Sequence, residues 1–401
     1  MFRIPRTFRL SIMERYRKIR PIDLEVPPST ITTKPVGGDP LRPRIYIPPS
    51  YIRSPVPLAA KTFLQPSTEV QQPREPRRLR VAFLGAPNAG KTSLFNQLLN
   101  VPVGAVSAKK NTTRESIMGV LTRENFQFEF VDCPGIVPLD GTEESKALSA
   151  EAWKNYNDCD CALLVVDTVK KPDSEFLKII RKIAPKQKIL DEWREFSDQS
   201  SSTRSNSVPV ILVLNKSDLV EDRKWLKVRQ YQLSGLGDFD KTFFVSAKEN
   251  RGLDTLVNYL KTRAVPGAWM YPLDAVTTLP KTAQLEQLIR SCLFTWFNKD
   301  VPYKIQQQTV GWTERLDGSL VIEHELIVKD SVVARMILGT KNRLLGRLRE
   351  NVVYKLKQNW NMDNITLLIY VKAETQRKSR RDKIEDSKRE NSHLYFSRGS
   401  G

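Results

Sequence analysis

The segment Gly85–Thr92, which reads GAPNAGKT, constrains the fold of this chain more than any other feature. It matches the pattern G-x-x-x-x-G-K-[S/T], follows a short apolar run that begins at Val81, and opens a predicted helix over Thr92–Leu99. A loop of this kind joins a buried strand to a helix and wraps backbone N–H groups around phosphate. The pattern in this context predicts an α/β domain with a phosphate-binding loop.

The apolar runs that follow predict the rest of this domain. They alternate with helix-like stretches and lie at Phe126–Val131, Ala162–Asp167, Val208–Leu214 and Thr242–Val245. Short buried strands between helices are typical of a mostly parallel sheet with helices on both faces. A polar stretch at 197–207 is interpreted as a surface insertion, which a fold tolerates at low cost. We place this domain at residues 80–263.

The loop chemistry assigns a role to several of its residues. Glycines let the backbone approach the phosphates, Lys91 reaches the outer phosphates, and the Thr92 hydroxyl is a magnesium ligand. The residues expected to contact the phosphates are Gly85, Ala86, Pro87, Asn88, Ala89, Gly90, Lys91, Thr92 and Ser93.

Two further segments complete the phosphate and metal side of the predicted site. Asp132 ends an apolar strand in the sequence DCPG, where a P-loop enzyme carries its metal-side carboxylate, and the Gly135 N–H would face the terminal phosphate. Thr113 can close over magnesium when the third phosphate is present. The expected magnesium ligands are Thr92, Thr113 and Asp132, and the residues expected to act in catalysis are Lys91, Asn88, Thr113 and Gly135.

Two motifs near later strand ends predict which base is bound. NKSD (Asn215–Asp218) offers a carboxylate that accepts two N–H donors of guanine, and adenine lacks that donor pair. SAK (Ser246–Lys248) offers a backbone N–H for the guanine carbonyl oxygen. Each motif alone could merely end a strand, cap a helix or form a turn, but their order favours GTP over ATP. The residues expected at the base are Asn215, Lys216, Asp218, Ser246, Ala247 and Lys248.

A second domain follows a proline-containing linker at 264–281. Its elements have a different order, and we place it at 282–372. The pattern predicts a helix at Thr282–Phe297, strands at Tyr303–Gly311 and Ser319–Val328, a short helix, a turn at Gly339–Asn342, a helix at Arg343–Gln358 and a strand at Ile365–Val371.

With these motifs the chain resembles the Era family of translational GTPases, in the TrmE–Era–EngA class. The residues that carry the resemblance are GAPNAGKTS (85–93), NTTRES (111–116), DCPG (132–135), NKSD (215–218) and SAK (246–248). The resemblance covers about residues 80–375. It implies an α/β P-loop GTPase domain followed by an α+β type II KH domain that binds RNA, and a role in assembly of the small ribosomal subunit.

The resemblance to a KH domain implies that the turn at Gly339 binds RNA. A KH domain presses a G-x-x-G loop against four nucleotides, and small residues permit that approach. The family's second glycine is Asn342 here, and asparagine tolerates left-handed backbone better than other non-glycine residues. Its side chain is expected to crowd the RNA and to alter affinity. The expected RNA contacts are Gly339, Thr340, Lys341, Asn342, Arg343 and Arg347.

Two positions bear on the rate of hydrolysis. Ile136 stands where a Ras-like enzyme has the glutamine that orients water, and an aliphatic side chain cannot do this. Asn88 lies where related GTPases bind potassium, which would stabilise developing charge; alternatively Asn88 only shapes the loop. We expect a slow, magnesium-dependent GTPase that binds GTP and GDP and uses potassium.

The two ends of the chain carry most of the positive charge. The net charge is +19, and residues 1–80 contain 16 Lys and Arg against 6 Asp and Glu, together with 14 of the 25 prolines. We expect residues 1–79 to be an extended or disordered leader, and 373–401 a charged tail. The first twenty residues have six Arg, one Lys and one Glu among apolar residues, which is typical of a mitochondrial transit peptide; a basic RNA-contacting tail is the alternative.

Composition excludes several classes of protein. No run approaches the ~18 apolar residues of a membrane span, and the four cysteines have neither the number nor the spacing of a disulfide framework or zinc site. The excess of basic residues favours a polyanionic partner.

The expected function is a GTP-driven switch that binds small-subunit ribosomal RNA and the assembling small subunit. The expected place is the mitochondrial matrix, with peripheral contact to the inner membrane through basic residues, and the expected state is a monomer. One alternative is an RNA-binding module that retains nucleotide without switching. Another is a peripheral membrane GTPase, although no lipidation motif accompanies the charge.

Overall fold

The structure is a computed structural model that describes residues 54–107, 109, 115–135, 143–186, 208–298 and 300–373. The predicted leader up to residue 53 and the tail from 374 onward lie outside the described residues. In the described part of the chain, no helix is both long and apolar enough to cross a membrane.

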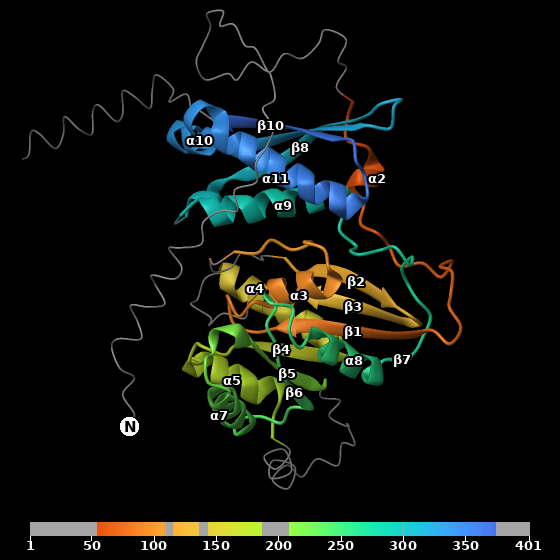
Figure 1. Ribbon diagram of the computed structural model, residues 1–401, viewed down its shortest axis with the longest axis vertical. Helices are drawn as coiled ribbons and strands as arrows, with labels where there is room; N and C mark the ends of the chain where they lie inside the picture. The colour runs from red at the N-terminus through yellow and green to blue at the C-terminus, as the bar shows by residue number, and fades with distance from the viewer. Residues whose placement is uncertain are drawn as a thin grey trace, which may run out of the picture. The chain divides into compact units, whose positions relative to one another are not determined.

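The first domain is built on a mostly parallel sheet, as predicted (Figure 1). Its main path runs β2-β3-β1-β4-β5-β6, and only β2 on this path is antiparallel to its neighbour. The strands are β1 (Arg77–Leu84), β2 (Ile117–Arg123), β3 (Phe126–Asp132), β4 (Cys161–Asp167), β5 (Val210–Asn215) and β6 (Lys241–Phe244).

Helices cover both faces of this sheet because successive strand residues point to opposite sides. Val81 and Phe83 of β1 belong to one core, while Ala82 and Leu84 belong to the other. The first core is shared with α3 (Lys91–Leu99) and α8 (Leu253–Arg263), and the second with α4 (Glu143–Asn157), α5 (Ser174–Ile183) and α7 (Arg223–Ser234). A short 3-10 turn, η1 (Ser217–Leu219), follows β5. The sheet therefore presents the carboxyl ends of its parallel strands at one edge, where the motifs gather.

The second domain has the helix–strand–strand–helix–helix–strand order of the expected type II KH fold. Its sheet runs β10-β9-β8, with β8 and β9 antiparallel and β9 and β10 parallel. Alternate residues of β9, including Ile322 and Leu326, join the three helices in one core. The elements are α9 (Lys281–Trp296), η2 (Val301–Lys304), β8 (Gln306–Glu314), β9 (Leu320–Val328), α10 (Ser331–Leu338), η3 (Thr340–Asn342), α11 (Arg343–Trp360) and β10 (Ile365–Ala373).

The last part of the predicted leader is folded, which differs from the sequence expectation. The backbone N–H of Trp312 in β8 donates to Ser54 O at 3.0 Å. Residues 58–61 form the short helix α2 (Leu58–Lys61). Ala60 is buried in the core of the second domain, and the Thr282 hydroxyl donates to its carbonyl oxygen at 3.1 Å. The proline-rich sequence has no internal periodicity, so tertiary packing rather than local preference orders this segment.

The linker is also held to the first domain. Its strand β7 (Val265–Pro266) pairs antiparallel with the start of β1. Farther along, Val120 in β2 donates to Val276 O at 2.8 Å, and Thr278 donates to Met118 O at 3.2 Å. Backbone hydrogen bonds to β1 near its start and to β2 near its end therefore hold the proline-containing stretch to the first domain.

Candidate nucleotide-binding site

The phosphate-binding loop has the backbone geometry that its glycines permit. Gly85 has φ +146° and Gly90 has φ +92°, and a Cβ on either would lie 2.2 Å from Val165 O or 2.3 Å from Asn215 Nδ2. Asn88 is also left-handed, at φ 63°. Only glycine fits the two tight positions, so the loop can run directly beneath the neighbouring strand ends.

Lys91 is buried beneath this loop. Its side chain is 5% exposed, and Nζ donates to the carbonyl oxygens of Gly85 and Ala86, each at 3.2 Å. Burial lowers the pKa of Lys91, while the nearby Asp132 carboxylate partly opposes that shift. The loop's own carbonyls therefore fix a cation at the base of the pocket, where it can meet phosphate charge.

Thr92 and Asp132 form the hard-oxygen pair that a magnesium ion requires. The hydroxyl of Thr92, at the start of α3, donates a 2.7 Å hydrogen bond to Oδ2 of Asp132, at the end of β3. Asp132 is fully buried. An hydroxyl and a carboxylate beside a phosphate-binding loop fit Mg²⁺, which would neutralise phosphate charge and orient the nucleotide when bound.

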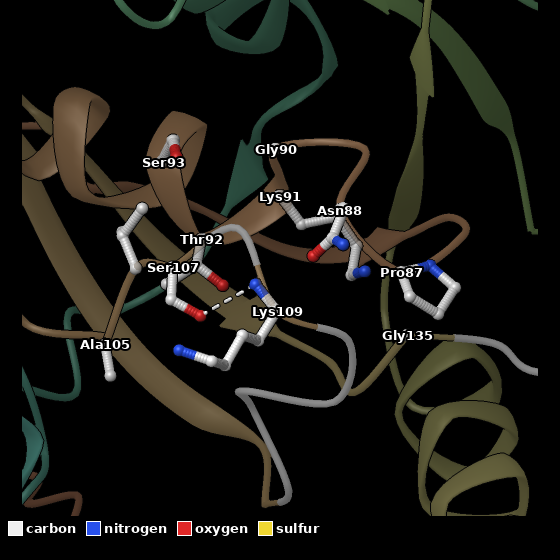
Figure 2. A pocket seen from close by; sticks show the side chains of 11 residues that line it. Pro87, Asn88, Gly90, Lys91, Thr92, Ser93, Ala105, Ser107, Lys109 and Gly135 are labelled. Atoms are coloured by element: carbon white, nitrogen blue, oxygen red, sulfur yellow. Dashed lines mark hydrogen bonds between the residues drawn. The ribbon is translucent and has the colours of Figure 1, made fainter. Parts of the chain in front are cut away.

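A pocket opens beside Thr92 (Figure 2). Its lining includes the expected Pro87, Asn88, Gly90, Lys91, Thr92, Ser93 and Gly135. A second wall, comprising Ala105, Val106, Ser107 and Lys109, is not expected from the motifs. The sequence sign of that wall is the pair of lysines, Lys109 and Lys110, at its end.

Two residues expected at this site lie outside the described residues. They are Thr113, the third expected magnesium ligand, and Ile136, which replaces the water-orienting glutamine. Gly135 is described, and its backbone lies close to Pro87, because a Cβ on Gly135 would be 2.9 Å from Pro87 Cγ.

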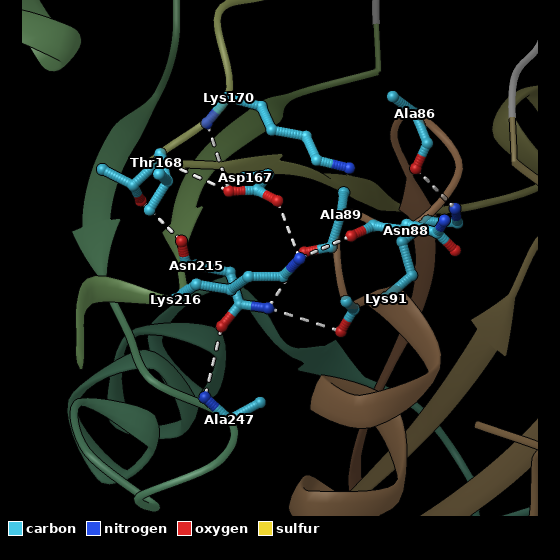
Figure 3. A network of polar contacts seen from close by, with 12 residues as sticks. Ala86, Asn88, Ala89, Lys91, Asp167, Thr168, Lys170, Asn215, Lys216 and Ala247 are labelled. Carbon is cyan, nitrogen blue, oxygen red and sulfur yellow. Dashed lines mark hydrogen bonds and ion pairs between the residues drawn. The ribbon is translucent and has the colours of Figure 1, made fainter. Parts of the chain in front are cut away.

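Asn215 ties the phosphate loop to the base-binding segments (Figure 3). Its buried amide Nδ2 donates to Ala89 O at 3.0 Å, and its Oδ1 accepts from the Ala247 N–H at 3.2 Å. One side chain thus joins the loop after β1 to the loop after β6. Asn215 therefore has a structural role in joining these two loops, in addition to the base-binding role that its motif predicts.

Lys216 and Asp167 form a second connection that the motifs alone do not predict. Lys216 Nζ donates to Asn88 O and to Asp167 Oδ2, both at 2.7 Å (Figure 3). Asp167 ends β4, and its other oxygen accepts from the Val169 N–H at 3.0 Å. Beside it, Thr168 donates its N–H to Asn215 O at 3.1 Å. The sequence sign was an aspartate at the end of a fully apolar strand, in line with Asp132 and Asn215.

Asp218 is oriented by Ser246. The Ser246 hydroxyl donates to Asp218 Oδ1 at 2.6 Å and accepts from the Glu249 N–H at 3.1 Å. Ser246 is fully buried, whereas Lys248 is exposed. The arrangement fixes the carboxylate that would accept the two guanine donors.

The predicted RNA loop lies in the second domain, between α10 and α11. Gly339 has φ +68°, and a Cβ there would lie 2.7 Å from Leu344 Cβ. Lys341 and Asn342 are left-handed at φ 52° and 60°, so asparagine does accept the conformation of the missing glycine. The exposed side chains at this loop are those of Thr340, Lys341, Asn342, Arg343 and Arg347.

Comparison with known proteins gives a consistent family. Residues 80–216 match a family model described as 50S ribosome-binding GTPase. GTPase Era of Ehrlichia canis is 29% identical over 292 residues, which is 73% of this chain and 91% of the relative. GTPase Era of Agrobacterium fabrum is 30% identical over 301 residues, or 71% of this chain and 87% of the relative. The chain belongs to the Era family.

A solved Era structure, in complex with MgGDPNP and a segment of 16S ribosomal RNA, has the same fold. The TM-score is 0.60 at 22% identity, over 77% of this chain and 98% of that one. As an Era-family member, the protein is a GTPase, and its loop, acidic and base-binding motifs fit a guanine nucleotide with Mg²⁺. The match spans both domains of the chain.

Proposed function

We propose that this Era-family GTPase is a switch that binds small-subunit ribosomal RNA through its KH domain during assembly of the mitochondrial small ribosomal subunit. The observation that carries the RNA-binding half is the tight loop at Gly339, with exposed Lys341, Arg343 and Arg347 around it. Close backbone approach with basic side chains nearby is how a KH loop grips single-stranded RNA. The solved Era bound to 16S ribosomal RNA supports the choice of RNA.

A direct contact supports the switching half of the proposal. Lys109 of the pocket wall donates from Nζ to the carbonyl oxygens of Phe294 and Phe297 at the end of α9. Ser291 also donates to Val106 O at 3.3 Å. The same short segment therefore lines the phosphate pocket and contacts the KH domain, so a change at the phosphates can alter the RNA-binding domain.

Potassium is part of the proposed mechanism. Asn88 lines the pocket, and its left-handed backbone is anchored by the hydrogen bond from Lys216. A monovalent cation at its side chain would supply the positive charge that other GTPases obtain from an arginine. GTP turnover should rise when potassium replaces sodium at equal ionic strength, and Asn88→Asp should change that ratio. Equal turnover in the two salts would remove potassium from the proposal.

The proposed location is the mitochondrial matrix, as a monomer with peripheral contact to the inner membrane. The support is the basic leader, with six Arg and one Lys in the first twenty residues. A Lys/Arg-rich segment is also attracted to anionic lipid, which supports the membrane contact.

Crosslinking in cells tests the proposed RNA partner and the proposed location of the protein in one experiment. Bound RNA is recovered after ultraviolet crosslinking of the full chain and sequenced, with organelle fractionation alongside. Lys341→Glu/Arg347→Glu is compared with Lys154→Glu/Lys178→Glu, which makes the same charge change on exposed lysines of α4 and α5. Reads on mitochondrial small-subunit ribosomal RNA that are lost only in the first variant are expected. Reads scattered over cytoplasmic RNAs would contradict the proposal.

A further inference from the structure

The outward face of α7 differs from that of an ordinary surface helix. Trp225 is 67% exposed, Tyr231 is 83% exposed and Val228 is 43% exposed. No other helix in the described part of the chain exposes as many large apolar side chains. Exposed helix faces are normally polar, so these three residues call for an explanation.

These side chains lie on one face. At ~100° per residue, positions 225, 228 and 231 fall within about 120° of the helix circumference. Leu233 on the opposite side is buried against α5 in the core of the domain. The three residues are therefore not part of the packing that fixes the helix to its domain.

The helix is basic, and two of its lysines lie on this face. The helix sequence RKWLKVRQYQLS contains four basic residues and no acidic residue. Lys224 and Lys227 are exposed, and by helical spacing they flank Tyr231. Asp222, just before the helix, accepts from the Lys224 N–H at 2.9 Å and caps its first turn.

Aromatic rings interleaved with lysines match the chemistry of unpaired RNA. Bases stack on exposed Trp and Tyr, and lysines meet the phosphates between them. A protein interface would also be enriched in Trp and Tyr but depleted of lysine, so the two exposed lysines beside the rings favour RNA. We propose that the α7 face, comprising Lys224, Trp225, Lys227, Val228 and Tyr231, is a second RNA-binding surface that takes single-stranded RNA.

This surface lies on the GTPase domain and is separate from the KH loop. It follows the guanine-binding Asp218 directly in sequence, through η1. The inference rests on the proposed function in one respect, which is that the protein binds RNA. It adds that the GTPase domain itself contacts an unpaired segment of that RNA.

Binding of a fluorescent 30-nucleotide unstructured RNA to the full chain tests the proposal. Trp225→Ala/Tyr231→Ala should weaken binding about tenfold or more, because two bases would lose the rings on which they stack. Lys224→Glu/Lys227→Glu should weaken binding and make the salt slope shallower by about 1.4, at roughly 0.7 per phosphate contact. Lys154→Glu/Lys178→Glu should bind like the native chain, and an equal duplex should bind less tightly.

Further readouts separate the possible outcomes. GTP affinity and the thermal midpoint should be unchanged in the α7 variants, because the altered side chains are exposed. After ultraviolet irradiation, mass spectrometry should find a nucleotide adduct on the peptide with Trp225 or Tyr231. If the native chain binds RNA and only Lys341→Glu/Arg347→Glu weakens it, the α7 proposal is wrong while the proposed function stands. If the native chain binds no RNA, both are wrong.

Discussion

The Thr92 hydroxyl donates a 2.7 Å hydrogen bond to the buried Asp132 carboxylate, and this pair joins the phosphate loop to the end of β3. The two oxygens come from elements 40 residues apart in sequence. Strand and helix therefore bring together a pair of oxygens, suited to a metal ion, that neither could form alone.

Removing the hydroxyl should disable magnesium-dependent turnover. We expect Thr92→Ala to lower kcat for GTP by about 100-fold or more, the usual cost of one lost group that stabilises developing charge. Thr92→Ser keeps the oxygen and should retain most of the activity. Turnover at several magnesium concentrations is the measurement, and Thr92→Ala activity equal to that of Thr92→Ser would show that the hydroxyl has no metal role.

Asp218 should determine the base. An amide at this position replaces one acceptor with a donor, so Asp218→Asn should weaken GTP binding by about 100-fold and improve binding of xanthosine triphosphate, which carries a carbonyl where guanine has its amino group. Ser246→Ala frees the Asp218 carboxylate from its 2.6 Å hydrogen bond and should weaken GTP binding more mildly. Competition titrations with both nucleotides measure this. Unchanged preference in Asp218→Asn would place the base elsewhere.

The folded end of the leader should support the second domain. Ala60→Asp places a carboxylate in a site that is 4% exposed and should lower the free energy of unfolding by about 3 kcal/mol. Leu58→Asp on the same short helix is the control, because Leu58 is 80% exposed. Denaturant unfolding of the full chain compares them, and equal stability of the two variants would mean that α2 does not contribute to the core.

His324 should make the second domain sensitive to acid. It is fully buried on β9, its Nδ1 lies 3.1 Å from the Thr309 hydroxyl, and burial lowers its pKa to about 4. The unfolded chain takes up this proton nearer pH 6.5, so stability should fall with decreasing pH, by about 2 kcal/mol between pH 8 and pH 5. His324→Gln should remove that part of the slope. A slope that is the same in the variant and the native chain would assign it to other groups.

Sequence patterns predicted the strands that are buried on both faces, because their apolar runs are continuous. They did not predict β2, whose edge position leaves Met118 and Thr122 half-buried and interrupts the pattern. Asp167 was missed as a site residue because its role depends on Lys216, 49 residues later, folding back to it. Ala60 was assigned to a disordered leader because nothing local shows that a four-residue helix will find a core. The misses of Asp167 and Ala60 share one cause, which is contact between segments distant in sequence.

The proposed switch requires that guanine nucleotide controls RNA binding. Its most direct test is the affinity of the full chain for a transcript of small-subunit ribosomal RNA, measured with a non-hydrolysable GTP analogue, with GDP and without nucleotide. Coupling of ~1–3 kcal/mol predicts affinities that differ by at least about fivefold between the analogue and GDP. The Lys109→Met variant, which removes the contact with α9, should reduce that difference. Equal affinity in all three states would contradict the account and leave an RNA-binding protein that retains nucleotide without switching.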